Sequence, residues 1–318
     1  MRKRETLVIV SLTVALLVVV VPYLVPVSYP AEVSSQSLVT SSGRFLDVSS
    51  DRIYVEEQGP PSLNAVVLLH GFGGSTFSWR GNVSFLASEG YHVVALDLRG
   101  FGLSSRDPQS DYSHKAQANL VAEVLQRLGI ARAYLIGHSM GSSVMFHFAH
   151  LHPEMVLGLI SVDGAVNLKP GSRLPSMLLA FPPFRRAARV FLTRYVSKDR
   201  FASILESAYH SKEVVSSDVI QGYYDRAIRS GWDESLLAMT RDMPRNVIDF
   251  PLESIEFRTL VIRGEEDTWV SQAEIDRWKN RVPNAVFYGV PDSGHLPMEE
   301  RPAVFNQIVL DFLHSTRN

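Results

Sequence analysis

The chain has 318 residues, of which 46% are hydrophobic and 10% aromatic, enough to fill the cores of one to three domains. The formal net charge is −2, so the overall charge does not point to a nucleic-acid partner. The absence of cysteine excludes disulfides, thiolate nucleophiles and cysteine-based metal sites.

The first predicted element is a membrane-spanning helix. Leu7–Val25 carries no charge and would span about 28 Å as a helix, close to the ~30 Å hydrocarbon core of a bilayer. The basic start, MRKR, predicts a cytoplasmic N-terminus and a protein body outside the cytoplasm. The alternative is a cleaved signal peptide, which would make the protein secreted. The apolar run is longer than the ~7–15 residues of a signal peptide, and PYLVP follows it rather than a small-residue cleavage site. We therefore expect residues 1–27 to form an uncleaved single-pass anchor.

The rest of the chain predicts an α/β fold. Residues 28–42, rich in Ser and Pro, predict a linker, and RFLDV and RIYVEEQ then predict a β-hairpin. Beyond them, short apolar runs alternate with longer helix-compatible segments, which is typical of a parallel sheet covered by helices on both faces. The predicted strands are 65–69, 92–96, 133–137, 156–162, 258–264 and 285–289.

The alternation is interrupted once. The stretch 167–257 has no convincing strand and contains the apolar run LPSMLLAFPPF followed by a basic helical run. We interpret it as a helical cap, so that 43–166 and 258–318 form the core. The apolar run predicts a lid or substrate tunnel, with Phe181 as a substrate-binding residue. The charges that follow it suit either a membrane surface or an ordinary solvated helix face.

The strongest chemical motif is GHSMG, which fits G-x-S-x-G with Ser139 at its centre. In this motif the turn from strand to helix is so tight that side chains on the flanking glycines would collide with backbone. A serine hydroxyl needs a base, and the base needs an orienting acid. His295 and Asp267 follow the last two predicted strands and supply these groups. The chain order is therefore Ser139, Asp267, His295.

These residues stand among further loop motifs: HGFGGS, DLRGFGLSS, GEEDTW and SGHLPMEERP. Taken together, the motifs resemble α/β-hydrolases of the lipase/esterase type from about residue 43 to the C-terminus. The apolar N-terminus is similar to that of membrane-bound monoacylglycerol-lipase-like members. The resemblance implies an α/β-hydrolase fold, a mostly parallel sheet with helices on both faces and a helical cap, preceded here by a transmembrane helix.

The resemblance also implies an oxyanion hole built from the backbone N–H groups of Phe72 and Met140. His138, beside the nucleophile, is a candidate pocket residue. Asp163 also follows a predicted strand and is the alternative triad acid, as in a minority of members of this fold. One departure from many relatives is Ser142, which replaces the second glycine of GHSMGG and lies inside the predicted helix.

The expected function is hydrolysis of a hydrophobic, small-molecule carboxylic ester such as a monoacylglycerol, through an acyl-enzyme. Epoxide hydrolases and haloalkane dehalogenases of this fold carry Asp at the elbow, whereas this chain has Ser139. The alternatives are a carbon–carbon bond hydrolase or cofactor-free perhydrolase with the same triad, and a non-catalytic binding protein on the same fold. No P-loop, dinucleotide fingerprint or metal-ligand spacing is present, so neither a cofactor nor a metal is expected; His147, His150 and His152 predict surface or packing roles. The sequence carries no signal for oligomeric state.

Overall fold

The computed structural model describes residues 2–30, 33–61 and 65–316, and these residues hold an eight-stranded sheet of order β1-β2-β4-β3-β5-β6-β7-β8. Strands β3 to β8 run parallel, while β2 runs antiparallel to both β1 and β4. The predicted α/β fold with a mostly parallel sheet is therefore confirmed. The strands are β1 (Gly43–Val48), β2 (Asp51–Gln58), β3 (Ala65–Leu69), β4 (His92–Leu96), β5 (Ala133–His138), β6 (Val156–Val162), β7 (Thr259–Gly264) and β8 (Ala285–Val290).

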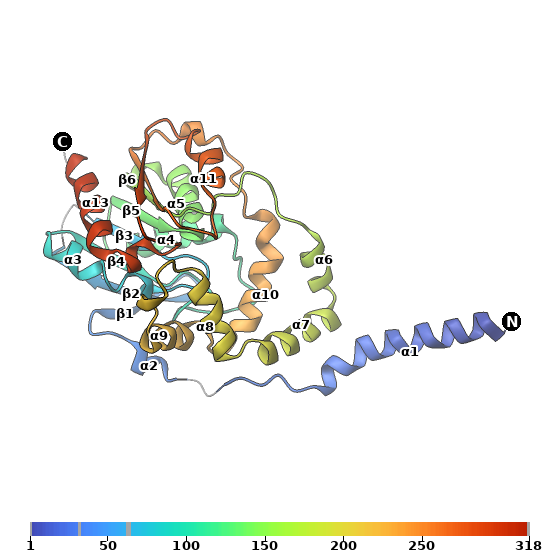
Figure 1. The fold of residues 1–318 in the computed structure, drawn as a ribbon. Helices are drawn as coiled ribbons and strands as arrows, with labels where there is room; N and C mark the ends of the chain where they lie inside the picture. The colour runs from blue at the N-terminus through green and yellow to red at the C-terminus, as the bar shows by residue number, and fades with distance from the viewer. Residues whose placement is uncertain (1, 31–32, 62–64, 317–318) are drawn as a thin grey trace.

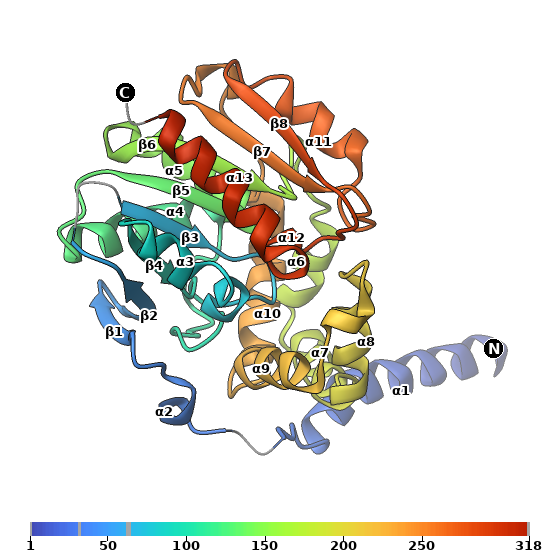
Figure 2. The same ribbon diagram turned by 60° about the vertical axis from the view of Figure 1, so that its left-hand side comes forward.

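Helices cover both faces of this sheet (Figures 1 and 2). On one face, α4 (His114–Arg127), α5 (Met140–Leu151) and α11 (Gln272–Lys279) pack into one apolar cluster. On the other, α3 (Val83–Ser88) and α13 (Pro302–Ser315) pack into a second. Every residue of β3 and β4 is buried, which explains why those strands are continuous apolar runs rather than alternating ones.

Local sequence signals explain where several helices begin. Ser113 caps α4 by accepting a hydrogen bond from the N–H of Ala116 at 3.3 Å. Ser271 and Glu274 form a capping box at the start of α11, each side chain accepting from the backbone N–H of the other. Short elements complete the core: α12 (Pro297–Glu300) and the 3₁₀ turns Thr76–Trp79 and Pro153–Met155. A further 3₁₀ turn, Leu252–Ser254, lies in the segment that leads into β7 and packs into the first of these clusters through Leu252.

The stretch 167–257 leaves the sheet after β6 and returns to it at β7. It contains α6 (Leu174–Ala180), α7 (Pro182–Tyr195), α8 (Lys198–Ser207), α9 (Ser217–Ala227) and α10 (Trp232–Asp242), with 3₁₀ turns at Lys212–Val214 and Met243–Arg245. These helices gather at one end of the sheet in Figure 2, beyond the carboxyl end of β5. We call them the cap.

The N-terminal segment, α1 (Arg2–Leu24), projects away from the body in both views (Figures 1 and 2). It is the one helix in the described part of the chain that is long and apolar enough to cross a membrane. It meets the body at α7, where Arg186 donates from Nε to the carbonyl of Pro22 (3.1 Å) and from Nη2 to that of Val25 (2.9 Å). The predicted linker contains one helical turn, α2 (Ser35–Leu38), which is tied to the cap by a hydrogen bond from Arg229 Nη2 to Ser35 Oγ (2.5 Å).

Candidate active site

The turn between β5 and α5 holds Ser139 in a strained backbone conformation. Its φ of 49° and ψ of −116° are rare for a residue with a side chain. A Cβ on Gly137 would lie 2.5 Å from the carbonyl oxygen of Gly141, and a Cβ on Gly141 would lie 2.4 Å from that of Leu69. Both flanking positions therefore require glycine, for the steric reason that the motif predicts.

Ser142 contributes to this turn in a way that the sequence did not indicate. Its hydroxyl donates to the carbonyl of Gly137 at 2.6 Å and accepts from Ser161 Oγ at 2.9 Å, entirely shielded from solvent. The side chain that replaces the second glycine thus ties the first turn of α5 back to the end of β5. It braces the elbow rather than disturbing it.

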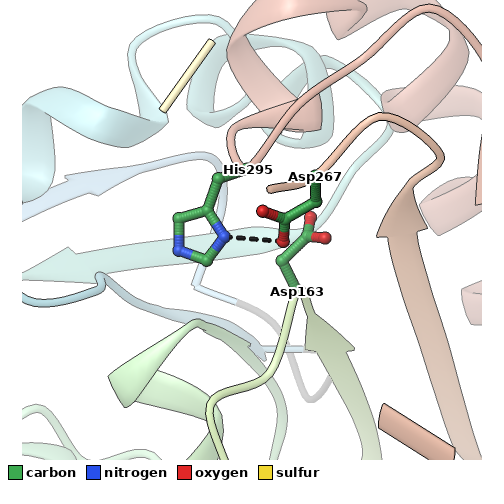
Figure 3. A group of neighbouring side chains, drawn as sticks. All are labelled: Asp163, Asp267 and His295. Carbon is green, nitrogen blue, oxygen red and sulfur yellow. Dashed lines mark hydrogen bonds and ion pairs between the residues drawn. The ribbon is translucent and has the colours of Figure 1, made fainter. Parts of the chain in front are cut away.

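The loops after β7 and β8 bring Asp267 and His295 together (Figure 3). His295 Nδ1 donates to Asp267 Oδ2 at 2.8 Å, and both side chains are buried. Asp267 Oδ1 also accepts from the backbone N–H groups of Trp269 (2.7 Å) and Val270 (3.1 Å). Burial opposes the charge on Asp267, but the hydrogen bond and charge of His295 outweigh it and keep the pKa of Asp267 below its ordinary value. The arrangement favours an ionised acid and a fixed imidazole.

The backbone of His295 is held from two sides. Its N–H donates to the carbonyl of Ala208 in the cap (2.8 Å), and its carbonyl accepts from His138 Nε2 (2.8 Å). Burial, with a smaller contribution from His295, lowers the pKa of His138 to about 3, so His138 is a neutral donor. Trp269 stacks on the His295 ring at 5.3 Å. Within the described residues no hydrogen bond joins His295 Nε2 to Ser139 Oγ, although both residues line the same pocket.

That pocket has a volume of about 480 Å³ and lies between the carboxyl ends of the strands and the cap. Ser139, His138 and His295 line its core side. Its cap side is almost entirely apolar, and the side chains come from α8, α9, α10 and the segments joining them: Phe201, Leu205, Ile228, Trp232, Leu236 and Met239. An apolar pocket that meets a few polar groups at one end suits a hydrophobic small molecule.

Phe181, the predicted substrate-binding residue of the cap, does not line this pocket. It follows the last residue of α6, is 47% exposed and packs edge-on against Phe184. The helix α6 lies against α7 and α10 instead, with Leu174, Met177 and Leu178 of its apolar run exposed. The later cap helices reach over Ser139, and the sequence could not reveal this because α8, α9 and α10 look like ordinary amphipathic helices.

The predicted oxyanion donors are the backbone N–H groups of Phe72 and Met140. Within the described structure, neither the Phe72 N–H nor the Met140 N–H donates a hydrogen bond to another protein group. The Met140 N–H is the first of α5, where no intrahelical acceptor exists. Phe72 and Ser139 line the same pocket, and the Phe72 ring rests edge-on against Phe101 at 5.7 Å.

Two buried polar residues brace the loop that carries Phe72. His70 Nε2 accepts from the N–H of Leu98 (3.0 Å), so Nδ1 bears the proton and donates to the carbonyl of Gly71 (2.7 Å). Asp97 accepts from the N–H groups of Thr76 (2.6 Å) and Leu103 (2.7 Å). Each residue thereby ties the HGFGGS loop to the loop after β4.

A buried polar cluster that the sequence did not indicate joins the cap to the core beside the pocket. Glu299 Oε2 forms an ion pair with Arg80 at 2.5 Å and accepts from the Tyr209 hydroxyl at 2.6 Å. Its other oxygen, Oε1, accepts from the hydroxyl of Tyr223, which lies 2.9 Å from Ser78 Oγ. The five residues come from three distant parts of the sequence, 78–80, 209–223 and 299, so no local spacing predicts the cluster. The next residue along the chain adds a further link, because Glu300 accepts from the backbone N–H groups of Gly294, His210 and Ser211.

Among the described residues, one group of acidic and histidine side chains is close enough to share a metal ion: Asp163, Asp267 and His295. His295 Nδ1 and Asp267 Oδ2 are already hydrogen-bonded to each other, so the acid–base pair explains why these side chains lie close together. His147 is buried edge-on against Phe250, and His150 stacks on the same ring at 4.1 Å, as packing residues do.

A sequence profile of the α/β hydrolase fold matches residues 64–302. The chain belongs to the α/β-hydrolase family. An uncharacterised hydrolase of Bacillus subtilis is 30% identical over 85% of this chain and 97% of its own length. A 2-hydroxy-6-oxononadienedioate/2-hydroxy-6-oxononatrienedioate hydrolase of Burkholderia vietnamiensis is 27% identical over 86% of this chain and 96% of its own. Epoxide hydrolases and an esterase are also among the similar proteins and structures.

One similar solved structure extends over the whole chain. A membrane phospholipase A described as a bacterial virulence factor covers 100% of this α/β hydrolase and 99% of its own chain, with a TM-score of 0.71 and 24% identity. The likeness in fold therefore includes the N-terminal helix. Together the comparisons show that the chain is a hydrolase of the α/β fold. The similar proteins are named for the hydrolysis of several different kinds of bond.

Proposed function

We propose that this protein is a serine hydrolase that cleaves carboxylic esters with hydrophobic acyl groups. The observation that carries the proposal is the strained Ser139 on the wall of an apolar pocket that His295 also lines, with His295 already hydrogen-bonded to Asp267. Nucleophile, base and orienting acid are the parts that acyl transfer requires.

In this mechanism His295 Nε2 removes the hydroxyl proton as Ser139 Oγ attacks the ester carbonyl. The tetrahedral oxyanion receives hydrogen bonds from the N–H groups of Phe72 and Met140, which have no protein acceptor of their own in the described structure. His295 then delivers the proton to the leaving alcohol. Water attacks the acyl-enzyme by the same route, and Asp267 stabilises the imidazolium in both halves of the reaction.

The pocket favours a neutral apolar substrate over the doubly charged substrate named for the Burkholderia hydrolase. Arg106 is the one cation among the described residues that line the pocket. Its guanidinium donates to the backbone carbonyls of Gly102, Arg226 and Arg229, so it is engaged by the protein. A dicarboxylate would be desolvated in this pocket without a dedicated partner, which is costly. Epoxide hydrolysis is disfavoured because Ser139 stands where epoxide hydrolases of this fold carry Asp.

A fluorophosphonate probe and a panel of substrates test the proposal. The probe is expected to label Ser139, and Ser139→Ala is expected to abolish both labelling and turnover of p-nitrophenyl esters and monoacylglycerols. Label on another serine, or full esterase activity in the alanine variant, would contradict the assignment. Turnover of a 2-hydroxy-6-oxo-dienoate with no turnover of any ester would favour the carbon–carbon hydrolase.

We further propose that α1 is an uncleaved anchor and that the α/β core lies outside the cytoplasm. The length and apolar composition of α1 support this. The hydrogen bonds from Arg186 to the carbonyls of Pro22 and Val25 also support it, because they connect the C-terminal end of the helix to the cap. The protein is expected to stay in the membrane pellet after a carbonate wash, and deletion of residues 1–25 is expected to release it. A mature N-terminus beyond Val25, found by mass spectrometry, would show instead that the segment is a cleaved signal.

A further inference from the structure

A second buried carboxyl group lies directly behind the acid of the proposed triad. Asp163 directly follows β6, is fully buried and has a φ of 43°, a backbone strain that a buried residue retains only where its surroundings hold it. Figure 3 shows its carboxyl group facing that of Asp267, on the side away from the His295 ring. One carboxylate oxygen of Asp163, one of Asp267 and one ring nitrogen of His295 all lie within 4.8 Å of one another.

Two ionised carboxyl groups this close in a buried site repel strongly, which favours a proton on one of them. The hydrogen-bond donors decide which. Asp267 accepts from His295 Nδ1 and from two backbone N–H groups. Among the residues that the structure describes, Asp163 accepts only from the Gly264 N–H, which is shared between its oxygens at 3.1 and 3.3 Å. A negative charge on Asp267 would be stabilised by three hydrogen-bond donors, whereas a negative charge on Asp163 would be stabilised by a single shared donor. The proton therefore belongs on Asp163.

The surrounding charges agree with this assignment. The groups that face Asp163 from β7 and from the loops after β7 and β8 are Arg263, Asp267 and His295. Arg263 directs its guanidinium to the backbone carbonyls of Glu265 (3.0 Å) and Asp267 (2.9 Å), not to either carboxyl group. Burial and then the charge of Asp267 raise the pKa of Asp163 well above its ordinary value.

We infer that Asp163 is a positioning residue: a neutral carboxylic acid that donates a hydrogen bond to the Asp267 carboxylate and holds it against His295. The inference rests on the proposed function for its effect on rate, but not for the protonation itself. The donor adds a hydrogen bond to those that Asp267 already accepts from His295, Trp269 and Val270, and it stops the carboxylate from rotating away from Nδ1. Asp163 is thus not an alternative triad acid in this protein, because His295 Nδ1 bonds to Asp267.

The decisive comparison is between Asp163→Asn and Asp163→Ala. The asparagine amide mimics a protonated carboxyl group, since its NH₂ can donate to Asp267 while its oxygen accepts from Gly264. Alanine cannot donate, so kcat is expected to fall by about tenfold or more with KM unchanged, as for loss of a hydrogen bond to a charged group. Asp163→Asn is expected to recover most of that loss. Asp292 is the control, since it also has a positive φ (49°) but is exposed on the neighbouring loop, and Asp292→Ala is expected to change kcat little.

The pH profile and an infrared spectrum separate this idea from its alternatives. If Asp163 were ionised, the asparagine variant would remove a negative charge near His295, and the acidic limb of kcat/KM would move to lower pH. An unmoved limb is expected. Independently of any activity, the infrared difference spectrum of wild type minus Asp163→Asn at neutral pH is expected to contain the carbonyl band of a protonated carboxylic acid. A difference spectrum with carboxylate bands alone would overturn the inference, as would an asparagine variant as slow as the alanine variant. Absence of esterase activity in the wild type would instead overturn the proposed function.

Discussion

Replacing Glu299 by alanine tests whether the buried cluster between cap and core stabilises the fold. The change leaves the Arg80 guanidinium without its ion pair and removes the acceptor of the Tyr209 and Tyr223 hydroxyls. Breaking a buried ion pair from one side costs about 3–5 kcal/mol. The Arg80 side chain is 31% exposed and can be partly rehydrated, so we expect the low end, about 3 kcal/mol. At roughly 2 °C per kcal/mol for a domain of this size, Tm falls by about 6 °C.

The measurement is thermal unfolding of the detergent-solubilised protein, together with ester hydrolysis. Because Glu299 lies in α12, directly after the His295 loop, kcat is expected to fall as the cap loosens from the core. Glu253→Ala is the matched control, since it also breaks an ion pair with arginine, 2.8 Å from Arg281 Nε, but on the open surface. A Glu299→Ala protein whose Tm matches that of Glu253→Ala would refute the reasoning.

Three further predictions follow from the site. Asp267→Asn is expected to lower kcat by about 10⁴-fold with the fold intact, and near-normal turnover would refute its role. Leu205→Ser and Ile228→Ser should slow long-acyl esters more than acetates, at about 0.8 kcal/mol per buried methylene, whereas Phe181→Ser, outside the pocket, should slow both equally little. Unfolding free energy should fall from pH 6.5 towards pH 4, because burial lowers the pKa values of four histidines and the unfolded chain takes up protons first. Each contributes about 1.4 kcal/mol per pH unit, so the His147→Phe variant should show a flatter slope than the wild type. The four are His70 (about 4), His114 (about 3), His138 (about 3) and His147 (about 4).

Much of the fold was predictable because its signals are local. The strands at 65–69, 92–96 and 156–162 have the predicted bounds, since a strand buried on both faces is a short run of apolar residues between turns. The elbow was predictable for the same reason, because Gly137 and Gly141 stand within two residues of Ser139. The proximity of Asp267 to His295 followed from topology, since parallel strands bring their carboxyl ends to one edge of the sheet.

The sequence by itself thus determined the α/β sheet, the elbow, the chain order of the three candidate groups and the apolar N-terminal helix. Tertiary structure alone decided which cap helices line the pocket: Leu205 lies on its wall and Phe181 does not. It also decided that Glu299 joins two cap tyrosines to Arg80, and that Asp163 shares a site with Asp267. The physical reason is the distance along the chain over which each interaction acts. Strand and turn preferences act over a few residues, whereas a hydrogen bond between buried groups a hundred residues apart depends on where the whole chain brings them, to within an ångström.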